Sequence, residues 1–448
     1  MPNPSKDRVS FHLEAESAPD FRAVEDEPFR IALLGDFSGR SQRPPIGARK
    51  PILIDRDNFD EVIEGLGVGV DLPGGRLSIG SLDHFHPDHI YARHPAFKEL
   101  GQNRARLDNP ETFPEAAREL LGEKTAPVPI PPGGLLNWIA GESDSSAASA
   151  PARDDLQDFI NDAMRSSLVA RQDPRAPHMI RRVDEVASSL MRAILNNGSF
   201  KAIEAAWRTV YYLVRRLETG PDLKIYLIDL TQAELAADIE AVAQLLLQRS
   251  EPWAVLAGNY SFGTDDLKVL GWMAKIAAKA QAPFLAEADG SLLGSDPQWE
   301  AFRQTVEAKH IGLALPRVLV RTPYGKNSSP CEEFAFEEID GTPEAKQMLF
   351  GSPAFYAAML IGEAFASDGW SLRPGSVREI SDLPVYTYKE DGGSKAFPCA
   401  EVELTQEIAE ALVERGLMPL AAIDSDVVRV VRFQSVAATP AALAGKWQ

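Results

Sequence analysis

The sequence predicts an α/β fold of mixed α+β character that is divided into more than one domain. Short apolar runs, typical of buried strands, alternate with longer segments that repeat apolar residues at helical spacing. The alternation is regular from residue 223 to residue 320, which favours an α/β domain in the second half of the chain. The length of 448 residues exceeds what one ordinary hydrophobic core accommodates.

The first part of the chain combines strand patterns with helical ones. Asp57 is placed to cap a helix that follows it over 58–66. A further helix begins at Pro87 and carries apolar residues as far as Leu100. Strands are expected at 9–15, 29–37 and 52–57, and a hairpin is expected over 71–82.

A change of composition marks the predicted domain boundary. The segment is rich in Pro and Gly and then in Ser and Ala, and such a composition cannot bury enough apolar surface to offset the entropy of ordering. We therefore expect a first domain over 1–122, a linker over 123–153 and a second domain over 154–448.

The second domain shows the clearest alternation of elements. Its longest amphipathic helix covers 200–218 and ends before Gly220 and Pro221. Other helices are expected over 181–196, 231–248, 265–280 and 406–415. Strands are expected over 223–230, 253–260, 283–288, 311–320, 400–405 and 427–436.

Charge and cysteine usage exclude several classes of function. A formal net charge of −19 disfavours nucleic acid and anionic membrane surfaces as partners. The two cysteines, Cys331 and Cys399, imply no disulfide framework and are compatible with a reducing cytoplasm. The sequence begins with a polar segment rather than a secretory signal, and it has no apolar run of eighteen residues, so no membrane insertion is expected.

Two stretches of the chain resemble two different proteins of one machine. Residues 29–107, which include FRIALLGDFSGR and LDHFHPDHI, resemble the small subunit of the type VI secretion contractile sheath. Residues from about 154 to 436, which include FKAIEAAWRTVYYLVRRLE and GLALPRVLVRTPYG, resemble the large subunit. The family normally supplies these subunits as two polypeptides that pair before they polymerise, whereas this chain resembles both in succession.

The resemblance implies a sheath-protomer-like fold, with a small mixed domain packed on a larger α/β domain. It implies a structural component of the bacterial cytoplasm, either a sheath protomer or a sheath-like accessory subunit, with no enzymatic activity and no cofactor. The implied partners are other sheath or sheath-like subunits, the inner tube protein, baseplate components and an AAA+ ATPase that disassembles the sheath. No nucleic acid is implied.

The resemblance also implies a difference at the end of the sequence. The family's large subunit continues beyond the position that matches RFQSVA, whereas this sequence ends AATPAALAGKWQ. In the family, the further segment contributes to the assembly layer and to strands exchanged between protomers. We therefore expect the isolated chain to be a monomer or a small oligomer.

The helix over 200–218 carries one of the most specific matches to the large subunit. Glu204 and Arg208 have the spacing that favours an ion pair on a helix, and Trp207 lies on an apolar stripe where we expect it to be buried. The three residues either stabilise the helix and its core or set the contact between domains or subunits.

A second match surrounds Pro316, which interrupts an apolar run and so confines that strand to an edge or a bulge. Arg317 and Arg321 lie on one side of the strand if it is regular. Salt bridges to nearby acidic residues, with Glu337 and Glu338 as candidates, are the expected role of these arginines.

The segment GDFSG, with Asp36 at its second position, follows the first buried strand. It lacks the lysine and the spacing of a phosphate-binding loop, so we expect a tight turn at the end of the strand. The small subunit has a similar turn at this place.

The sharpest competing motif is HxHxDH, formed by His84, His86, Asp88 and His89. These residues can converge on Zn²⁺ and leave positions open for a hydroxide nucleophile, which makes a zinc-dependent hydrolase the alternative function. The histidines and bridging aspartate that such hydrolases carry downstream are not recognisable. We therefore expect no metal and a turn into a helix, capped by Asp83 or Asp88.

Overall fold

The computed structural model describes residues 27–121 and 173–447, apart from the single positions 73, 295, 391 and 440. We call 27–121 the first region and 173–447 the second region. The strand expected at 9–15 and the linker expected at 123–153 lie outside the described residues, and the domain boundaries stay a prediction.

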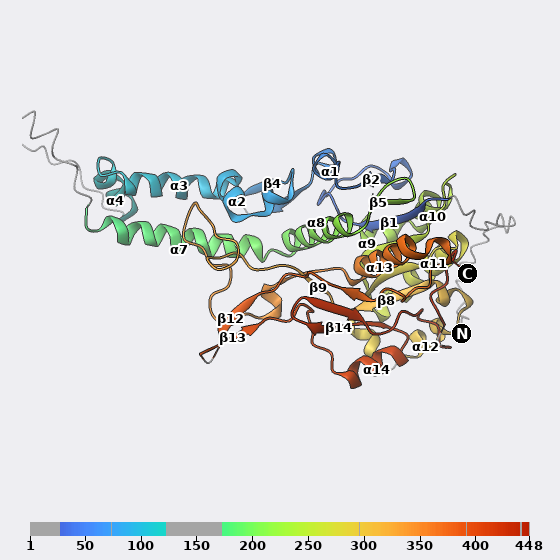
Figure 1. Cartoon of the computed structure of the whole chain (residues 1–448). Helices are drawn as coiled ribbons and strands as arrows, with labels where there is room; N and C mark the ends of the chain where they lie inside the picture. The colour runs from blue at the N-terminus through green and yellow to red at the C-terminus, as the bar shows by residue number, and fades with distance from the viewer. Residues whose placement is uncertain are drawn as a thin grey trace, which may run out of the picture.

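One mixed sheet of nine strands organises both regions (Figure 1). The order across the sheet is β11-β15-β14-β8-β7-β6-β1-β5-β2. The strands from β14 to β5 in this order run parallel, and the pairs at both ends of the sheet are antiparallel. The bounds are β1 Phe29–Gly35, β2 Ile52–Ile54, β5 Leu223–Asp229, β6 Val255–Phe262, β7 Phe284–Ala288, β8 Ile311–Leu315, β11 Glu379–Ile380, β14 Met418–Asp424 and β15 Val427–Val430.

Strand β1 belongs to the first region but lies in the middle of this sheet. Ile31 is in register with Ile225 of β5 on one side and with Val255 of β6 on the other. All seven residues of β1 are buried, as expected of a strand that is apolar on both faces and is covered by helices on both sides. The sequence predicts a small domain packed on a larger one, whereas the structure shows a sheet that both regions build.

Helices cover the two faces of the sheet, and β1 contributes to the core on each face. Ile31 and Leu33 lie in the cluster under α8 (Gly198–Arg216) and α13 (Pro353–Asp368). Ala32 and Leu34 lie in the opposite cluster, under α10 (Ile239–Leu247) and α11 (Leu267–Ala280). The expected α/β class is therefore confirmed, with the core on both sides of the shared sheet.

The end of the molecule distant from the sheet is a rod of helices (Figure 1). Helix α7 (Ala176–Leu195) runs beside α3 (Pro95–Asp108), and α4 (Phe113–Leu121) packs at the tip. The single helix expected from Pro87 onward is wrong, because α2 (Pro87–Arg93) ends at Arg93, His94 is extended, and Pro95 starts α3. Between sheet and rod the first region forms α1 (Phe59–Leu66) and the expected hairpin of β3 (Gly69–Leu72) and β4 (Gly75–Ser78).

The remaining elements complete the second region. Strand β9 (Val318–Arg321) pairs with β10 (Leu349–Gly351), and β12 (Thr387–Glu390) pairs with β13 (Gly393–Ala396). The remaining helices are α9 (Gln232–Ala237), α12 (Pro297–Arg303) and α14 (Gln406–Glu414). The strand expected at 400–405 is wrong, because that segment makes only an isolated bridge from Ala400 to Val318. Among the described residues, no helix is both long and apolar enough to cross a membrane.

Candidate functional site: the buried contact between the two regions

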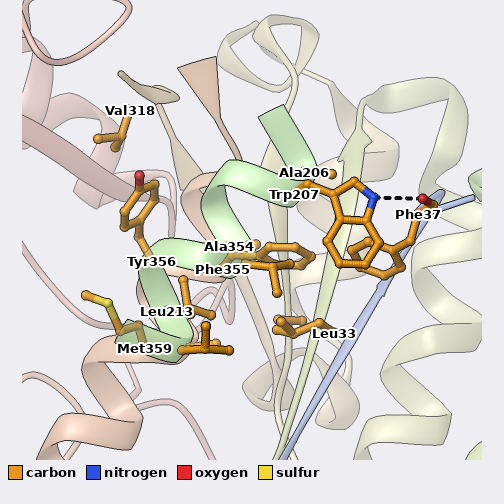
Figure 2. Close-up of a cluster of buried hydrophobic side chains, with 14 of the residues drawn as sticks. Leu33, Phe37, Ala206, Trp207, Leu213, Val318, Ala354, Phe355, Tyr356 and Met359 are labelled. Carbon is orange, nitrogen blue, oxygen red and sulfur yellow. Dashed lines mark hydrogen bonds between the residues drawn. The ribbon is translucent and has the colours of Figure 1, made fainter. Parts of the chain in front are cut away.

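Trp207 of α8 lies where the two regions meet (Figure 2). Its indole is completely buried, as the sequence predicts, and its Nε1 donates a hydrogen bond to the carbonyl oxygen of Phe37 over 2.9 Å. The rings of Phe37 and Phe59 pack edge-on against it at 5.9 and 5.6 Å between centroids. Trp207 is thus a core residue whose aromatic neighbours come from the other region.

One turn away on the same helix, Glu204 is the centre of a buried ion cluster. Its carboxylate accepts hydrogen bonds from Arg208 over 2.8 Å and from Arg321 over 2.7 Å. Arg321 also donates to both carboxylate oxygens of Glu338, over 2.7 and 3.0 Å. The hydroxyl of Tyr324 contacts Glu204 at 3.3 Å and accepts from Arg208 at 2.8 Å. The expected pairs Glu204–Arg208 and Arg321–Glu338 therefore belong to one network.

The network keeps Glu204 ionised although no part of its side chain is exposed. Burial alone would raise the pKa of Glu204, but the charges and hydrogen bonds of Arg321 and Arg208 more than compensate, and the pKa lies below its ordinary value. Removing one guanidinium partner of a buried carboxylate strongly destabilises the folded protein, because a charge is then left without its partner. The cluster therefore fixes the relative positions of α8, β9 and the segment around residue 338.

Tyr324 extends the cluster to the first region. Its hydroxyl donates to the carbonyl oxygen of Phe85 over 3.3 Å, and its ring lies edge-on against the imidazole of His86 at 5.0 Å. Ser329 of the second region also contacts His86, because its hydroxyl lies 3.3 Å from Nε2 of the imidazole. The HxHxDH loop is therefore a contact surface for the second region.

His86 and Asp88 have roles that the sequence does not predict. The N-terminal cap of α2 is His86, whose Nδ1 accepts from the backbone N–H of Asp88, so the expected caps Asp83 and Asp88 are wrong. The Asp88 carboxylate points instead to the second region, where it accepts from the thiol of Cys331 over 2.7 Å and from the N–H groups of Glu332 and Glu333. These hydrogen bonds outweigh burial and lower the pKa of Asp88.

The other histidines of the loop also form local contacts. His84 accepts from the N–H of Gly80 over 2.9 Å and lies 2.8 Å from Arg93, and its ring is 5.4 Å from that of His89. Within 27–121 and 173–447, no group of three or more His, Cys, Asp and Glu side chains has an arrangement that could hold a metal ion. The zinc-hydrolase alternative is therefore not supported.

The turn after β1 is held by a carboxylate of the second region. Asp229, at the end of β5, accepts from the N–H groups of Phe37 and Ser38 over 2.9 and 3.1 Å and from the Ser38 hydroxyl over 2.7 Å. Asp36 accepts from the N–H of Gly39 within the turn, over 2.8 Å. The expected tight turn is present, and its position depends on Asp229, which the sequence does not single out.

Arginines of the first region make a second set of contacts that sequence reasoning missed. Arg43 lies 3.2 Å from Asp229, and Arg49 donates to Glu234 over 3.1 Å and to the Asp229 carbonyl oxygen over 2.8 Å. Burial would raise the pKa of Glu234, but the hydrogen bonds from Arg49 and Thr231 and the charge of Arg49 lower it to about 2. Similar contacts join Arg56 to the Val214 carbonyl oxygen and Arg104 to Asp184.

Asp57 does not have the expected role as a helix cap. Helix α1 begins at Phe59 with Asn58 at the cap position, and the Asn58 side chain accepts no hydrogen bond from the first turn of the helix but one from the N–H of Asp55 over 2.9 Å. The Asp55 carboxylate instead accepts hydrogen bonds from the N–H groups of Asp57 and Asn58, over 3.0 Å each. The turn before α1 is thus organised two residues earlier than the sequence pattern indicates.

The arginines after Pro316 do not lie on one side of a regular strand. Strand β8 ends at Leu315, and β9 begins only at Val318, so the apolar run is broken at Pro316. Arg317 is 45% exposed and donates to Glu401 over 2.8 and 2.6 Å, whereas Arg321 is 8% exposed and belongs to the buried cluster.

Comparison with known proteins identifies the class to which this architecture belongs. The family model VipB, described as the tail sheath N-terminal domain, matches residues 177–298 and 296–437. The family model for VipA of the type VI secretion system matches residues 3–115. The chain is therefore a contractile-sheath protein. It belongs to the type VI secretion sheath family and carries both the small-subunit and the large-subunit parts on one chain.

One curated relative and two solved structures are similar to parts of the chain. The type VI secretion system sheath protein TssC1 of Pseudomonas aeruginosa is 28% identical over 284 residues, which are 54% of this chain and 57% of that protein. The chain thus spans less than two thirds of the relative's length. The anti-feeding prophage baseplate is similar at 16% identity over 52% of this chain and 51% of that chain (TM-score 0.32). The contracted PVC sheath of an extracellular contractile injection system is similar at 12% identity over 52% and 49% (TM-score 0.29).

Proposed function

We propose that this chain is a building block of a type VI secretion apparatus in which the small-subunit and large-subunit parts are already paired. The observation that carries the proposal is the position of β1, which is hydrogen-bonded between β5 and β6. A strand in the middle of a sheet cannot leave without exposing backbone N–H and C=O groups on both neighbours. The fused arrangement makes the pairing intramolecular, so it does not depend on the concentration of a second subunit.

The role is structural, as a sheath protomer or a sheath-like accessory subunit, and does not include catalysis. Its partners in this role are other sheath or sheath-like subunits and baseplate components, with the inner tube protein and an AAA+ disassembly ATPase as further contacts in the bacterial cytoplasm. The sheath-family matches and the similarity to TssC1, a type VI secretion system sheath protein, support this assignment. The residues that keep the building block intact are Asp36, Glu204, Trp207, Arg208 and Arg321.

A fractionation experiment tests the proposal. An epitope-tagged copy is expressed in a bacterium that assembles the apparatus, and sheath and baseplate particles are collected by ultracentrifugation. We expect the tagged chain in the particle fraction, and we expect it in the supernatant when the same strain lacks its other sheath subunits and baseplate. A chain that stays in the supernatant of both strains contradicts the proposal. Immunogold label along the whole particle indicates a protomer, and label at one end indicates an accessory subunit.

A further inference from the structure

A cavity of about 620 Å³ lies beside the shared sheet and outside the contact described above. Its volume falls within the range of roughly 300–1,000 Å³ that is usual for ligand sites. One wall is a face of α8 on which Gly198, Ala202 and Ala205 leave space because their side chains are small. The opposite walls are formed by β10, the cap of α13 and the segment around Glu401.

The cavity lies where open α/β sheets commonly bind ligands. Asn259 and Ser261 from the second half of β6, and Glu287 from β7, line it together with Arg317, which follows β8. These strands are adjacent and parallel, so their carboxyl ends point to the same side of the sheet. Ligands of such sheets bind in the crevice outside the carboxyl ends of the strands.

Glu287 is a carboxylate in this cavity with no hydrogen-bond donor among the described residues. Its side chain is 23% exposed, and the nearest cationic atom, Nε of Arg317, is 3.9 Å away. That distance is too long for a hydrogen bond. Arg317 is occupied by Glu401, to which it donates over 2.8 and 2.6 Å. Burial raises the pKa of Glu287 to about 7, against the lowering effect of the Arg317 charge and together with the raising effects of the Glu401 and Asp289 charges.

The other polar groups of the cavity divide into paired and unpaired ones. Lys201 donates to the carbonyl oxygen of Lys346 over 2.7 Å, and burial lowers its pKa. Lys346 is itself paired with Glu344 at 2.6 Å. The hydroxyl of Ser352, a residue only 4% exposed, has no partner among the described residues. That hydroxyl is fully buried, so it is not open to a ligand. The acceptors that the cavity offers are the Glu287 carboxylate and the side-chain oxygens of the partly exposed residues Asn259 and Ser261, while Lys201, Lys346 and Arg317 each have a partner.

We propose that this cavity binds the guanidinium group of an arginine side chain presented by a partner protein. A guanidinium is always charged and has five N–H donors, so it can serve several acceptors from one position. The formal net charge of −19 favours the approach of a basic partner over an acidic one. This binding site goes beyond the proposed building-block role and does not rest on it.

Titration of the purified full chain with N-acetylarginine methylamide, followed by NMR or calorimetry, tests the site. N-acetylglutamine methylamide serves as a neutral probe. We expect saturable binding of the arginine probe only, at least about tenfold weaker in Glu287→Gln because a charge-assisted hydrogen bond is lost. Glu403→Gln removes the same charge from an exposed position and should leave the affinity within about twofold. Filling the space with Ala202→Phe should abolish binding without lowering the melting temperature.

The pH dependence separates Glu287 from a general acidic surface. Binding should be at least about tenfold tighter at about pH 8.5 than at about pH 5.5, because the raised pKa of about 7 leaves Glu287 mostly protonated at the lower pH. Glu287→Gln should remove this difference, and the always-charged probe cannot cause it. Equal affinity of wild type and Glu287→Gln, equal affinity for both probes, or no saturable binding would each overturn the proposal. The fractionation experiment on assembly does not depend on any of these three outcomes, so failure of this site and failure of the proposed function can be told apart.

Discussion

The two regions meet at the shared sheet and along the helical rod, and these two contacts differ in kind. At the sheet, β1 is wholly buried and hydrogen-bonded on both sides. Along the rod, α3 and α4 lie on α7 through one small apolar cluster, and Leu120 and Leu121 near the tip are 46% and 57% exposed. The residues of that cluster are Leu107, Phe113, Ala116, Ala117, Ala176 and Val183.

The difference shows where the fusion of two subunit-like parts matters for folding. Removing β1 would leave backbone hydrogen-bonding groups of β5 and β6 unpaired and would open apolar clusters on both faces of the sheet. Separating the rod helices would expose only a few apolar side chains and would leave each helix with its internal hydrogen bonds. We therefore expect the sheet contact to unfold only with the whole protein, and the rod contact to open locally.

The largest expected effect is at the sheet contact. Trp207→Ala should lower the free energy of unfolding by about 3–5 kcal/mol, because it removes a completely buried indole and its hydrogen bond to Phe37. Denaturant unfolding measures the change. Trp272→Ala on α11 is the matched control, since that indole is only partly buried and should cost clearly less. Equal losses at both positions would show that Trp207 has no special place between the regions.

The ion cluster should follow closely in size. Glu204→Gln should cost roughly 3 kcal/mol, because Arg321 and Arg208 then lose the charge that they face inside the protein. Glu344→Gln, which changes an exposed carboxylate paired with Lys346, is the control and should be nearly neutral. Unchanged stability of Glu204→Gln would mean that the cluster does not hold α8 against β9.

Arg49→Met should have an intermediate effect of about 1–3 kcal/mol at neutral pH, because it removes charged hydrogen bonds to Glu234 and to the Asp229 carbonyl oxygen. The pKa of Glu234 is lowered from 4.5 to about 2 in the folded protein. Its contribution is therefore full above about pH 4.5 and is lost as the pH falls toward about 2. The difference in stability between wild type and Arg49→Met should shrink over that interval. A difference that stays constant from neutral to acidic pH would contradict this role of Glu234.

Much of the sheet follows from the sequence, and most of the contact does not. The runs that form β1, β5 and β7 are short, apolar and bounded by turn residues, so their type could be predicted locally. Helix α13 was missed because nearly all of its positions are buried, which removes the periodic pattern. The pairs of Arg43 and Arg49 with the second region join residues more than 180 positions apart, and local spacing holds no information on them.

The smallest expected effect is in the rod. Arg104→Met removes a partly exposed ion pair with Asp184 and should cost less than about 1 kcal/mol. Hydrogen exchange should accelerate in α3 and α4 while β1 keeps its protection, because the rod opens without the sheet. Arg106→Met, which loses only the exposed ion pair with Glu119, is the control. It should change neither the stability of the protein nor the hydrogen exchange of α3 and α4. Faster exchange in β1 after Arg104→Met would show that rod and sheet are one cooperative unit.

Cleavage between the two regions tests their common fold most directly. A protease site is inserted into the predicted linker at 123–153, the folded chain is cut, and the fragments are followed by size exclusion and thermal unfolding. If β1 is an integral strand of the sheet, the fragments should elute together and unfold in one transition, and the second fragment alone should be misfolded. Fragments that separate under native conditions, with the second keeping its melting temperature and circular dichroism, would show that the two regions are independent domains.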